Sequence, residues 1–255
     1  MIIVEAEQGS QQWFEARMGI PTASEFHRII QPGGEPRFKK NGEPYKSKAG
    51  EPAEGRWGYA YELAVERLLG ESKDTIDGLR WVERGKALEG DAVQHFEFVT
   101  DCRTAKCGFV MPDHKRFGCS PDRILVDELG GLELKVPAPA THLRYFIEGP
   151  GAAYKCQVQG SMYVTGFPVW YFMSYSPNLP QVLIKFERDE EFIEKIAAAL
   201  DQFCGEIDEV CEKVRQAGYV PPAHLTTPTE AAYGEMMRSD MNAAGHIIEQ
   251  SNWGG

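Results

Sequence analysis

Several signatures of common protein classes are missing from this sequence of 255 residues. No stretch approaches the roughly 18 consecutive apolar residues that a membrane-spanning helix requires. The segment from Met1 to Glu5 lacks the basic start and the long apolar core of a signal peptide. We therefore expect a cytoplasmic protein with no membrane partner.

The motifs of three widespread classes of enzyme and nucleotide-binding protein are also missing. There is no Gly-x-Ser-x-Gly elbow of a serine hydrolase and no Gly-x(4)-Gly-Lys-Ser/Thr phosphate loop. The six histidines are scattered without a His-x(3)-His pair, which disfavours a zinc hydrolase. Any chemistry in this chain has to come from other side chains.

Six cysteines are present, but none of them belongs to a Cys-x-x-Cys pair. Zinc and iron–sulfur sites usually need such tight spacing. With no export signal, we expect reduced thiols that pack as small apolar groups. The six are Cys102, Cys107, Cys119, Cys156, Cys204 and Cys211.

Acidic residues outnumber basic ones, and the formal net charge of −11 argues at first against a nucleic-acid partner. The excess is unevenly distributed, because the chain from Glu187 onward has 14 acidic and five basic residues. Residues 1–186 carry 24 acidic and 22 basic residues and are almost neutral. A local basic groove in this larger part remains compatible with nucleic acid.

The composition, 42% hydrophobic and 25% charged, is that of an ordinary globular protein, and the length suits one substantial α/β or α+β domain. A continuous apolar stripe from Phe192 to Val214 predicts a long core helix with an acidic outer face. Apolar periodicity predicts the remaining elements, with the first four strands in hairpin-like succession. Further helices are expected at 9–19, 22–30, 56–69, 80–99, 139–147 and 152–165, and strands at 104–111, 116–119, 123–126, 131–136, 168–175 and 181–187.

The most informative stretch runs from Ser120 to Lys135 and contains the pattern Asp–x(10)–Glu–x–Lys. Strand alternation predicts that Glu133 and Lys135 project from one face and Leu134 from the other. Asp122 and Glu133 are hard oxygen ligands that suit Mg²⁺ or Mn²⁺, and a lysine beside them can place a water for attack on a phosphate. A simple ion pair between Glu133 and Lys135 is the alternative interpretation.

Two other stretches are compatible with binding to nucleic acid. Thr22-Ala23-Ser24-Glu25 predicts a capping box, and a helix start of this kind suits a phosphate. A plain helix cap is the alternative. Residues 31–55 interleave basic residues with aromatic ones and could contact nucleic acid, or could form a solvated loop.

Six ordered blocks of residues stand out along the chain. These blocks are Trp13-Phe14-Glu15-Ala16-Arg17-Met18-Gly19, Thr22-Ala23-Ser24-Glu25, Gly85-Lys86-Ala87-Leu88-Glu89, Cys119-Ser120-Pro121-Asp122, Gly131-Leu132-Glu133-Leu134-Lys135, and Gln157-Val158-Gln159-Gly160-Ser161-Met162-Tyr163-Val164-Thr165. Through these blocks the chain resembles the phage lambda exonuclease family, the YqaJ-like viral recombination nucleases of the restriction-endonuclease-like superfamily. The resemblance extends from Trp13 to about Gly218.

This resemblance implies an α/β (α+β) fold with a central mixed β-sheet flanked by helices. It implies a Mg²⁺-dependent 5′→3′ exonuclease that degrades one strand from a duplex DNA end, releases 5′-mononucleotides and leaves a 3′ single-stranded tail. Two Mg²⁺ ions are expected, and Mn²⁺ can substitute. The implied metal ligands are Asp122, Glu133 and the Leu134 carbonyl, with Glu89 serving a second ion or a water. Lys135 would stand beside the attacking water.

By the same resemblance, Arg17, Ser24, Ser120 and Gln157 match a pocket for the 5′-phosphate. Gln159 and Tyr163 form a Gln-x(3)-Tyr motif that could serve the site or support its helix. The implied assembly is a ring-shaped homotrimer, which would retain DNA by enclosing it. The implied partner is a single-strand annealing protein of a phage or prophage in a bacterial host.

We expect a single exonuclease domain over residues 1–220 and an appendage or partly ordered tail over residues 221–255. An iron–sulfur nuclease is disfavoured, because only Cys204 and Cys211 follow the Gln-x(3)-Tyr motif. A non-catalytic DNA-end-binding scaffold of the same fold is the alternative function. The intact Asp122, Glu133 and Lys135 argue against it.

Overall fold

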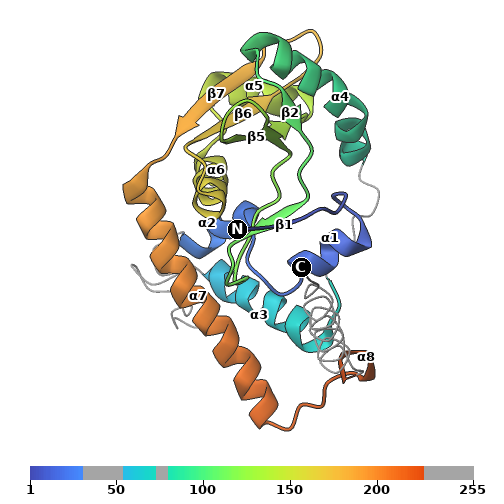
Figure 1. Ribbon diagram of the computed structural model, residues 1–255, viewed down its shortest axis with the longest axis vertical. Helices are drawn as coiled ribbons and strands as arrows, with labels where there is room; N and C mark the ends of the chain where they lie inside the picture. Colours follow the sequence, from blue (N-terminus) through green and yellow to red (C-terminus); the bar gives the residue numbers. More distant parts are fainter. Residues whose placement is uncertain (31–53, 73–79, 227–255) are drawn as a thin grey trace, which may run out of the picture.

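The computed structural model of the protein describes residues 1–30, 54–72 and 80–226 (Figure 1). Most of the basic segment at 31–55, and the tail beyond Thr226, lie outside the described residues. The helices are α1 (Gln11–Arg17), the 3₁₀ turn η1 (Ala23–Glu25), α2 (Phe26–Ile30), α3 (Glu54–Leu69), α4 (Arg80–Thr100), α5 (Pro139–Glu148), α6 (Ala152–Thr165), α7 (Glu190–Gln216) and α8 (Ala223–Thr226). None of these described helices is long and apolar enough to cross a membrane.

A five-stranded mixed sheet forms the centre of the fold and has the order β2-β4-β5-β6-β7. The strands are β1 (Ile2–Val4), β2 (Thr104–Ala105), β3 (Phe109–Met111), β4 (Arg123–Leu125), β5 (Gly130–Lys135), β6 (Val169–Ser174) and β7 (Val182–Glu187). Within this sheet β5 and β6 are parallel, because α5 and α6 carry the chain from one to the other. The other pairs in the sheet are antiparallel.

Helices cover both faces of the sheet. On one face Leu134 and Tyr171 belong to the same core cluster as Phe96 of α4. On the other face Trp170 packs with Met162 of α6. Because both faces are covered, β6 is buried at every position and is apolar almost throughout.

A second core lies where α7 packs along α3 and α2, at the opposite end of the molecule from α4 and α5 (Figure 1). The predicted apolar stripe of α7 is confirmed as core, with Ile196, Leu200 and Phe203 fully buried. The helix begins where the Asp189 side chain accepts a hydrogen bond from the Phe192 N–H.

The predicted helices are confirmed, with boundaries that shift by a few residues. The strands expected at 123–126, 131–136, 168–175 and 181–187 are confirmed as β4, β5, β6 and β7. The predicted hairpin-like succession is confirmed for β4 and β5, which pair antiparallel, but it is wrong for the segments before them. The expected strand at 104–111 is split between two sheets, since β2 pairs with β4 whereas β3 pairs with β1. The expected strand at 116–119 is reduced to isolated bridges at Gly118 and Cys119. The structure of both segments depends on which distant strands they pair with, and the local alternation of apolar residues does not encode that pairing.

The cysteine expectation is confirmed, because all six thiols lie in the described part of the chain as free cysteines and five of them are buried. Burial raises the pKa of the Cys119 thiol well above its ordinary value. Such neutral thiols pack as small apolar groups.

The contact between Gly131 and Trp170 yields a stability prediction. A Cβ atom at Gly131 would lie 2.5 Å from the Trp170 ring, too close for any real contact. Gly131→Ala should therefore lower the free energy of unfolding by about 1–3 kcal/mol. In α7, Gly205→Ala meets no atom within 4 Å and should be neutral or stabilising by up to about 1 kcal/mol. Urea unfolding of both variants checks this, and a Gly131→Ala protein as stable as wild type would contradict it.

Candidate active site

Glu133 and Lys135 form the centre of the site. They project from one face of β5 and pair through the Lys135 ammonium and the Glu133 carboxylate. The Glu133 side chain is almost fully buried, whereas the Lys135 side chain is 32% exposed. Leu134 lies on the opposite face within the core beneath α4. The predicted alternation of β5 is confirmed.

Asp122, the residue directly before β4, lies close to this pair. The Leu134 N–H donates a hydrogen bond of 2.6 Å to the Asp122 Oδ2 atom. Burial, and after it the negative charge of Glu133, raises the pKa of Asp122 to about 7. The two carboxylates of the Asp–x(10)–Glu pattern are therefore close enough to repel each other.

The Leu134 carbonyl faces the same side as Asp122. On β5 the Lys135 carbonyl accepts a hydrogen bond from the Tyr175 N–H on the β6 side. Neighbouring peptide groups of a strand alternate in direction, and the Leu134 N–H points away from β6 toward Asp122. In a strand the N–H and C=O of one residue point the same way. The Leu134 carbonyl therefore lies on the Asp122 side, as its predicted role as a ligand requires.

Lys135 carries its proton in this site. Burial disfavours the ammonium, but the Glu133 and Asp122 carboxylates outweigh that effect and hold the pKa of Lys135 above its usual value. The Tyr154 ring lies 5.7 Å from the Lys135 Nζ atom, and the Tyr154 hydroxyl is 3.0 Å from that of Tyr145. Burial raises the pKa of Tyr154 to about 12. Tyr154 is thus an uncharged aromatic side chain that lies beside Lys135. This role of Tyr154 was not predicted from the sequence.

Glu89 approaches from α4 and is held by an arginine. Its Oε1 atom is 2.7 Å from the Arg123 Nη2 atom, and Arg123 directly follows Asp122. Glu89 is also near enough to contribute to the raised pKa of Asp122. Within residues 1–30, 54–72 and 80–226, no three His, Cys, Asp or Glu side chains gather as a ready-made metal cluster. The third carboxylate, Glu89, is paired with Arg123 instead.

The donor set nevertheless fits a divalent cation. Two carboxylates and a peptide carbonyl are the hard oxygen ligands that Mg²⁺ takes, with the rest of its coordination supplied by water and phosphate. The raised pKa of Asp122 shows that two negative charges are unfavourable here without a compensating cation.

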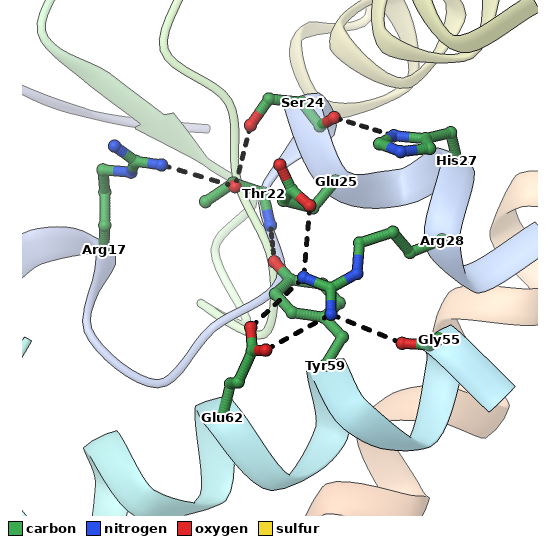
Figure 2. A network of polar contacts seen from close by, with 9 residues as sticks. All are labelled: Arg17, Thr22, Ser24, Glu25, His27, Arg28, Gly55, Tyr59 and Glu62. Atoms are coloured by element: carbon green, nitrogen blue, oxygen red, sulfur yellow. Dashed lines mark hydrogen bonds and ion pairs between the residues drawn. The ribbon is translucent and has the colours of Figure 1, made fainter. Parts of the chain in front are cut away.

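A second polar site lies around Arg17, Thr22 and Ser24 (Figure 2). The Thr22 Oγ1 atom accepts a hydrogen bond of 3.5 Å from Arg17 Nη2 and lies 3.2 Å from Ser24 Oγ. These three residues line a pocket of about 200 Å³. Two of the four residues predicted to bind a 5′-phosphate, Arg17 and Ser24, are therefore brought together, and Thr22 links them.

The floor of this pocket is built by α3. The Tyr59 hydroxyl accepts a hydrogen bond of 3.1 Å from the Thr22 N–H, and its ring lies 4.7 Å below the Arg28 guanidinium. Arg28 is itself held by Glu25 and Glu62 (Figure 2). The predicted capping box is wrong, because the Thr22 hydroxyl bonds to side chains and caps no backbone N–H. The chain enters α2 through η1 instead.

Ser120 and Gln157 lie outside the lining of this pocket. Ser120 is connected to it through Trp13, whose Nε1 atom donates a hydrogen bond of 3.1 Å to Ser120 Oγ. The Arg17 guanidinium stacks 3.9 Å from the centre of the Trp13 ring. Gln157 is half-buried on α6, the helix that packs against η1. The four predicted phosphate ligands thus come from α1, η1, α6 and the segment before β4.

The segment from Gly118 to Asp122 connects the two sites. At its start, Gly118 donates a hydrogen bond to the Pro21 carbonyl and accepts one from the Ala23 N–H, at 3.0 and 2.9 Å. At its end, Asp122 accepts the Leu134 hydrogen bond. One short stretch of backbone therefore positions both sites: the carboxylate site of Asp122 and Glu133, and the pocket lined by Arg17, Thr22 and Ser24, here called the arginine–serine pocket.

Gln159 and Tyr163 make contacts within the fold. The Gln159 side chain donates to the Glu187 carbonyl and accepts from the Asp189 N–H, at 2.8 and 3.0 Å. Tyr163 stacks on Phe117, with ring centroids 5.4 Å apart. Gln159 thus holds the chain where β7 turns into α7, and Tyr163 packs in the second core.

Sequence analysis missed the linking roles of Trp13, Thr22 and Arg123. Trp13 and Arg17 are four residues apart on α1, and that spacing was the only local signal of their stacking. The roles of Thr22 and Arg123 depend on α3 and α4, which meet them only in the folded chain.

Solved structures of exonucleases are similar to this one. An alkaline exonuclease from Laribacter hongkongensis is 27% identical, with a TM-score of 0.67 over 82% of this chain and 97% of that chain. The same enzyme in complex with dAMP gives a TM-score of 0.68 at 27% identity, over 82% and 98% of the two chains. A phage-related exonuclease from Haemophilus somnus 129PT shares the fold, with a TM-score of 0.58 at 17% identity over 76% and 96%. These similarities support a nuclease role for this chain.

The family follows from the sequence itself. Residues 12–168 match the model of the YqaJ-like viral recombinase domain. No curated protein matches the chain. The protein belongs to the YqaJ-like viral recombinase family, as its six motif blocks indicated.

The raised pKa of Asp122 predicts how stability depends on pH without divalent metal. An ordinary aspartate has a pKa of about 3.9, so between about pH 4 and 7 the folded protein binds more protons at Asp122 than the unfolded chain does. Stability from this group is complete below that window and is lost as the pH rises through about 7. In EDTA, the free energy of unfolding should fall between about pH 4 and 7, by at most about 1.4 kcal/mol per pH unit.

Asp122→Asn keeps an acceptor for the Leu134 N–H but cannot titrate, so its stability profile should be flatter than that of wild type. Thermal unfolding across the pH series measures both proteins. Parallel profiles would contradict the assignment of this pH dependence to Asp122.

Proposed function

We propose that the protein is a Mg²⁺-dependent exonuclease that binds linear double-stranded DNA ends and degrades one strand 5′→3′, leaving a 3′ single-stranded tail. The observation that carries this proposal is the connection of two sites through residues 118–122. One site offers carboxylates and a lysine, and the other offers an arginine and hydroxyl groups. A terminal nucleotide has a 5′-phosphate and a scissile phosphodiester, and it needs both kinds of site.

In this proposal Arg17, Ser24, Ser120 and Gln157 hold the terminal 5′-phosphate, since a guanidinium and neutral donors bind phosphate oxygens well. Trp13 keeps Arg17 and Ser120 in place. The protein then positions the next phosphodiester beside the carboxylates. Digestion proceeds from the 5′ end because the phosphate pocket accepts only a chain terminus.

Asp122, Glu133 and the Leu134 carbonyl would hold Mg²⁺, and Glu89 would serve a second ion or orient a water. The bound cation would lower the pKa of a water and offset charge on the scissile phosphate. Lys135, which is held by its ion pair with Glu133 and lies beside the Tyr154 ring, orients the attacking water. The dAMP complex of the Laribacter enzyme supports a mononucleotide as product, because dAMP carries a single phosphate on one nucleoside.

A homotrimeric ring and a single-strand annealing partner complete the proposal. The acidic outer face of α7 would disfavour duplex binding on the outside of such a ring. Native mass spectrometry tests the trimer. Enclosure also implies a weak salt dependence of DNA binding, so a slope that indicates many phosphate contacts would count against it.

The deciding assay uses linear duplex DNA with different labels on its 5′ and 3′ ends, incubated with Mg²⁺ or with EDTA. We expect mononucleotide release from the 5′ end with Mg²⁺ and none with EDTA. A non-catalytic scaffold of the same fold would bind the ends and release nothing. Release from the 3′ label first would reject the proposed polarity.

Replacement of Lys135 tests its role beside the attacking water. Lys135→Ala should lower the cleavage rate by at least about a hundredfold, the usual contribution of a positioned acid–base group. Lys135→Arg keeps a positive charge beside the buried Glu133, yet it should also be impaired because the guanidinium has a different shape. DNA-end binding should be retained in both variants. Lys195→Ala, on the exposed face of α7, is the matched control, and turnover of Lys135→Ala at the wild-type rate would reject the role.

Replacement of Arg17 tests the phosphate pocket. Arg17→Ala should reduce the preference for 5′-phosphorylated over 5′-hydroxyl ends by roughly ten- to a hundredfold, since a charged hydrogen bond contributes about 1.5–3 kcal/mol. The measurement is kcat/KM on the two kinds of end. Arg144→Ala, exposed on α5, is the control. An equal loss on both kinds of end would show that Arg17 does not bind the phosphate.

A further inference from the structure

The outer face of α3 is apolar along its whole length. Trp57, Tyr61, Val65 and Leu69 follow one another at four-residue spacing and are 41%, 53%, 51% and 41% exposed. The Trp57 and Tyr61 rings lie 6.2 Å apart. Apart from Gly55, these four are the exposed residues of α3 whose side chains the structure describes. A contiguous exposed stripe of this size usually marks a binding surface.

The remaining faces of α3 are already in use. Arg56 points inward to a two-point ion pair with Glu206 of α7, at 2.9 Å. Tyr59 and Glu62 face the phosphate pocket. The helix is therefore fixed on one side by the core and on another by the pocket, and the apolar stripe is a rigid surface.

The chain leaves the described structure beside one end of this stripe. The His224 Nε2 atom of α8 lies 2.9 Å from the Leu69 carbonyl, and Leu225 lies against Gly70. The Tyr219 hydroxyl donates a hydrogen bond to the Leu68 carbonyl. Residues 227–255 therefore start at the Leu69 end of α3, and these 29 residues are long enough to follow the helix back toward Trp57.

The sequence of residues 227–255 has a matching apolar pattern. Tyr233, Met237, Met241, Ala244 and Ile248 recur at steps of four, four, three and four. This is the spacing of one face of an amphipathic helix. As a helix, the pattern would span about 22 Å, and the stripe from Trp57 to Leu69 spans about 18 Å. The two stripes match in length and in character.

We propose that residues 227–255 dock along the outer face of α3 and cover Trp57, Tyr61, Val65 and Leu69. The docked segment runs antiparallel to α3, because it starts at the Leu69 end. This is the packing of an amphipathic helix on an apolar groove or face, here within one chain. The C-terminal segment then packs, within the same chain, on α3, the helix that forms the floor of the phosphate pocket.

Hydroxyl-radical footprinting of the full-length protein tests the proposal from the tail side. Oxidation of Trp57 and Tyr61 should be slow in wild type and at least about fivefold faster in Met237→Asp/Met241→Asp, because charges on the apolar stripe oppose docking. These changes leave residues 1–226 untouched, so a failure of that part to fold does not confuse the result. Ser239→Asp, on the opposite side of the predicted tail helix, is the matched control and should behave as wild type.

Limited trypsin cleavage after Arg238 tests the proposed docking through changes in α3. The triple variant Trp57→Ser/Tyr61→Ser/Val65→Ser should be cut there at least about tenfold faster than wild type. Phe146→Ser/Ile147→Ser removes apolar side chains of α5 that are at least as exposed on average, and it should not change the rate. Thermal unfolding verifies that each variant is folded.

Three results would overturn the proposal. Fast oxidation of Trp57 and Tyr61 in wild type would show an uncovered face. Equal rates in the tail variant and wild type would show that the stripe of residues 227–255 is not involved. Protection that disappears on dilution would assign the face to a second copy of the chain. None of these measurements depends on nuclease activity.

Discussion

The hydrogen bond from the Leu134 N–H to the Asp122 carboxylate is the constraint on which the site depends. It fixes the entry into β4 against the end of β5 and places two carboxylates on one side of the sheet. The same bond directs the Leu134 carbonyl toward the space beside Asp122. Gly118, four residues earlier, forms backbone hydrogen bonds with Pro21 and Ala23. The position of β4 therefore also fixes the position of the η1 turn. A single backbone path therefore sets the distance between the carboxylates and the arginine–serine pocket.

The electrostatic cost of this arrangement is visible in the Asp122 carboxyl, whose pKa is raised to about 7 by burial and by Glu133. The protein offsets part of the charge with two cations, Lys135 beside Glu133 and Arg123 beside Glu89. The two cations differ in what they leave open. Arg123 of β4 is largely buried where it pairs with Glu89 of α4, whereas the Lys135 side chain stays partly exposed. This asymmetry matches the proposed function, in which the site binds a cation and a phosphate.

Helix α3 connects three parts of the molecule. Arg56 ties it to α7, Tyr59 holds the backbone of Thr22, and the opposite face carries the apolar stripe that begins at Trp57. A change on the outer face is thus only one helix thickness from the pocket lined by Arg17, Thr22 and Ser24. Docking of the C-terminal segment there would stabilise the floor of the pocket without contacting DNA.

The sequence by itself determined the features that rest on local periodicity and on ordered motifs. Strand alternation placed Glu133 and Lys135 on one face, the three- and four-residue steps of α7 identified a core helix, and the motif blocks identified the family. Each of these signals is contained in a few neighbouring residues, and the structure agrees with them.

Only the tertiary structure decided the rest. The split of residues 104–111 between two sheets, the link through Thr22 and the Arg123–Glu89 pair all depend on contacts between segments far apart in the chain. Thr22 was expected to cap a helix, but the Tyr59 hydroxyl and the Arg17 guanidinium gave its polar atoms other partners. Hydrogen bonds of this kind depend on which elements become neighbours after packing, and no local pattern of residue types records that choice.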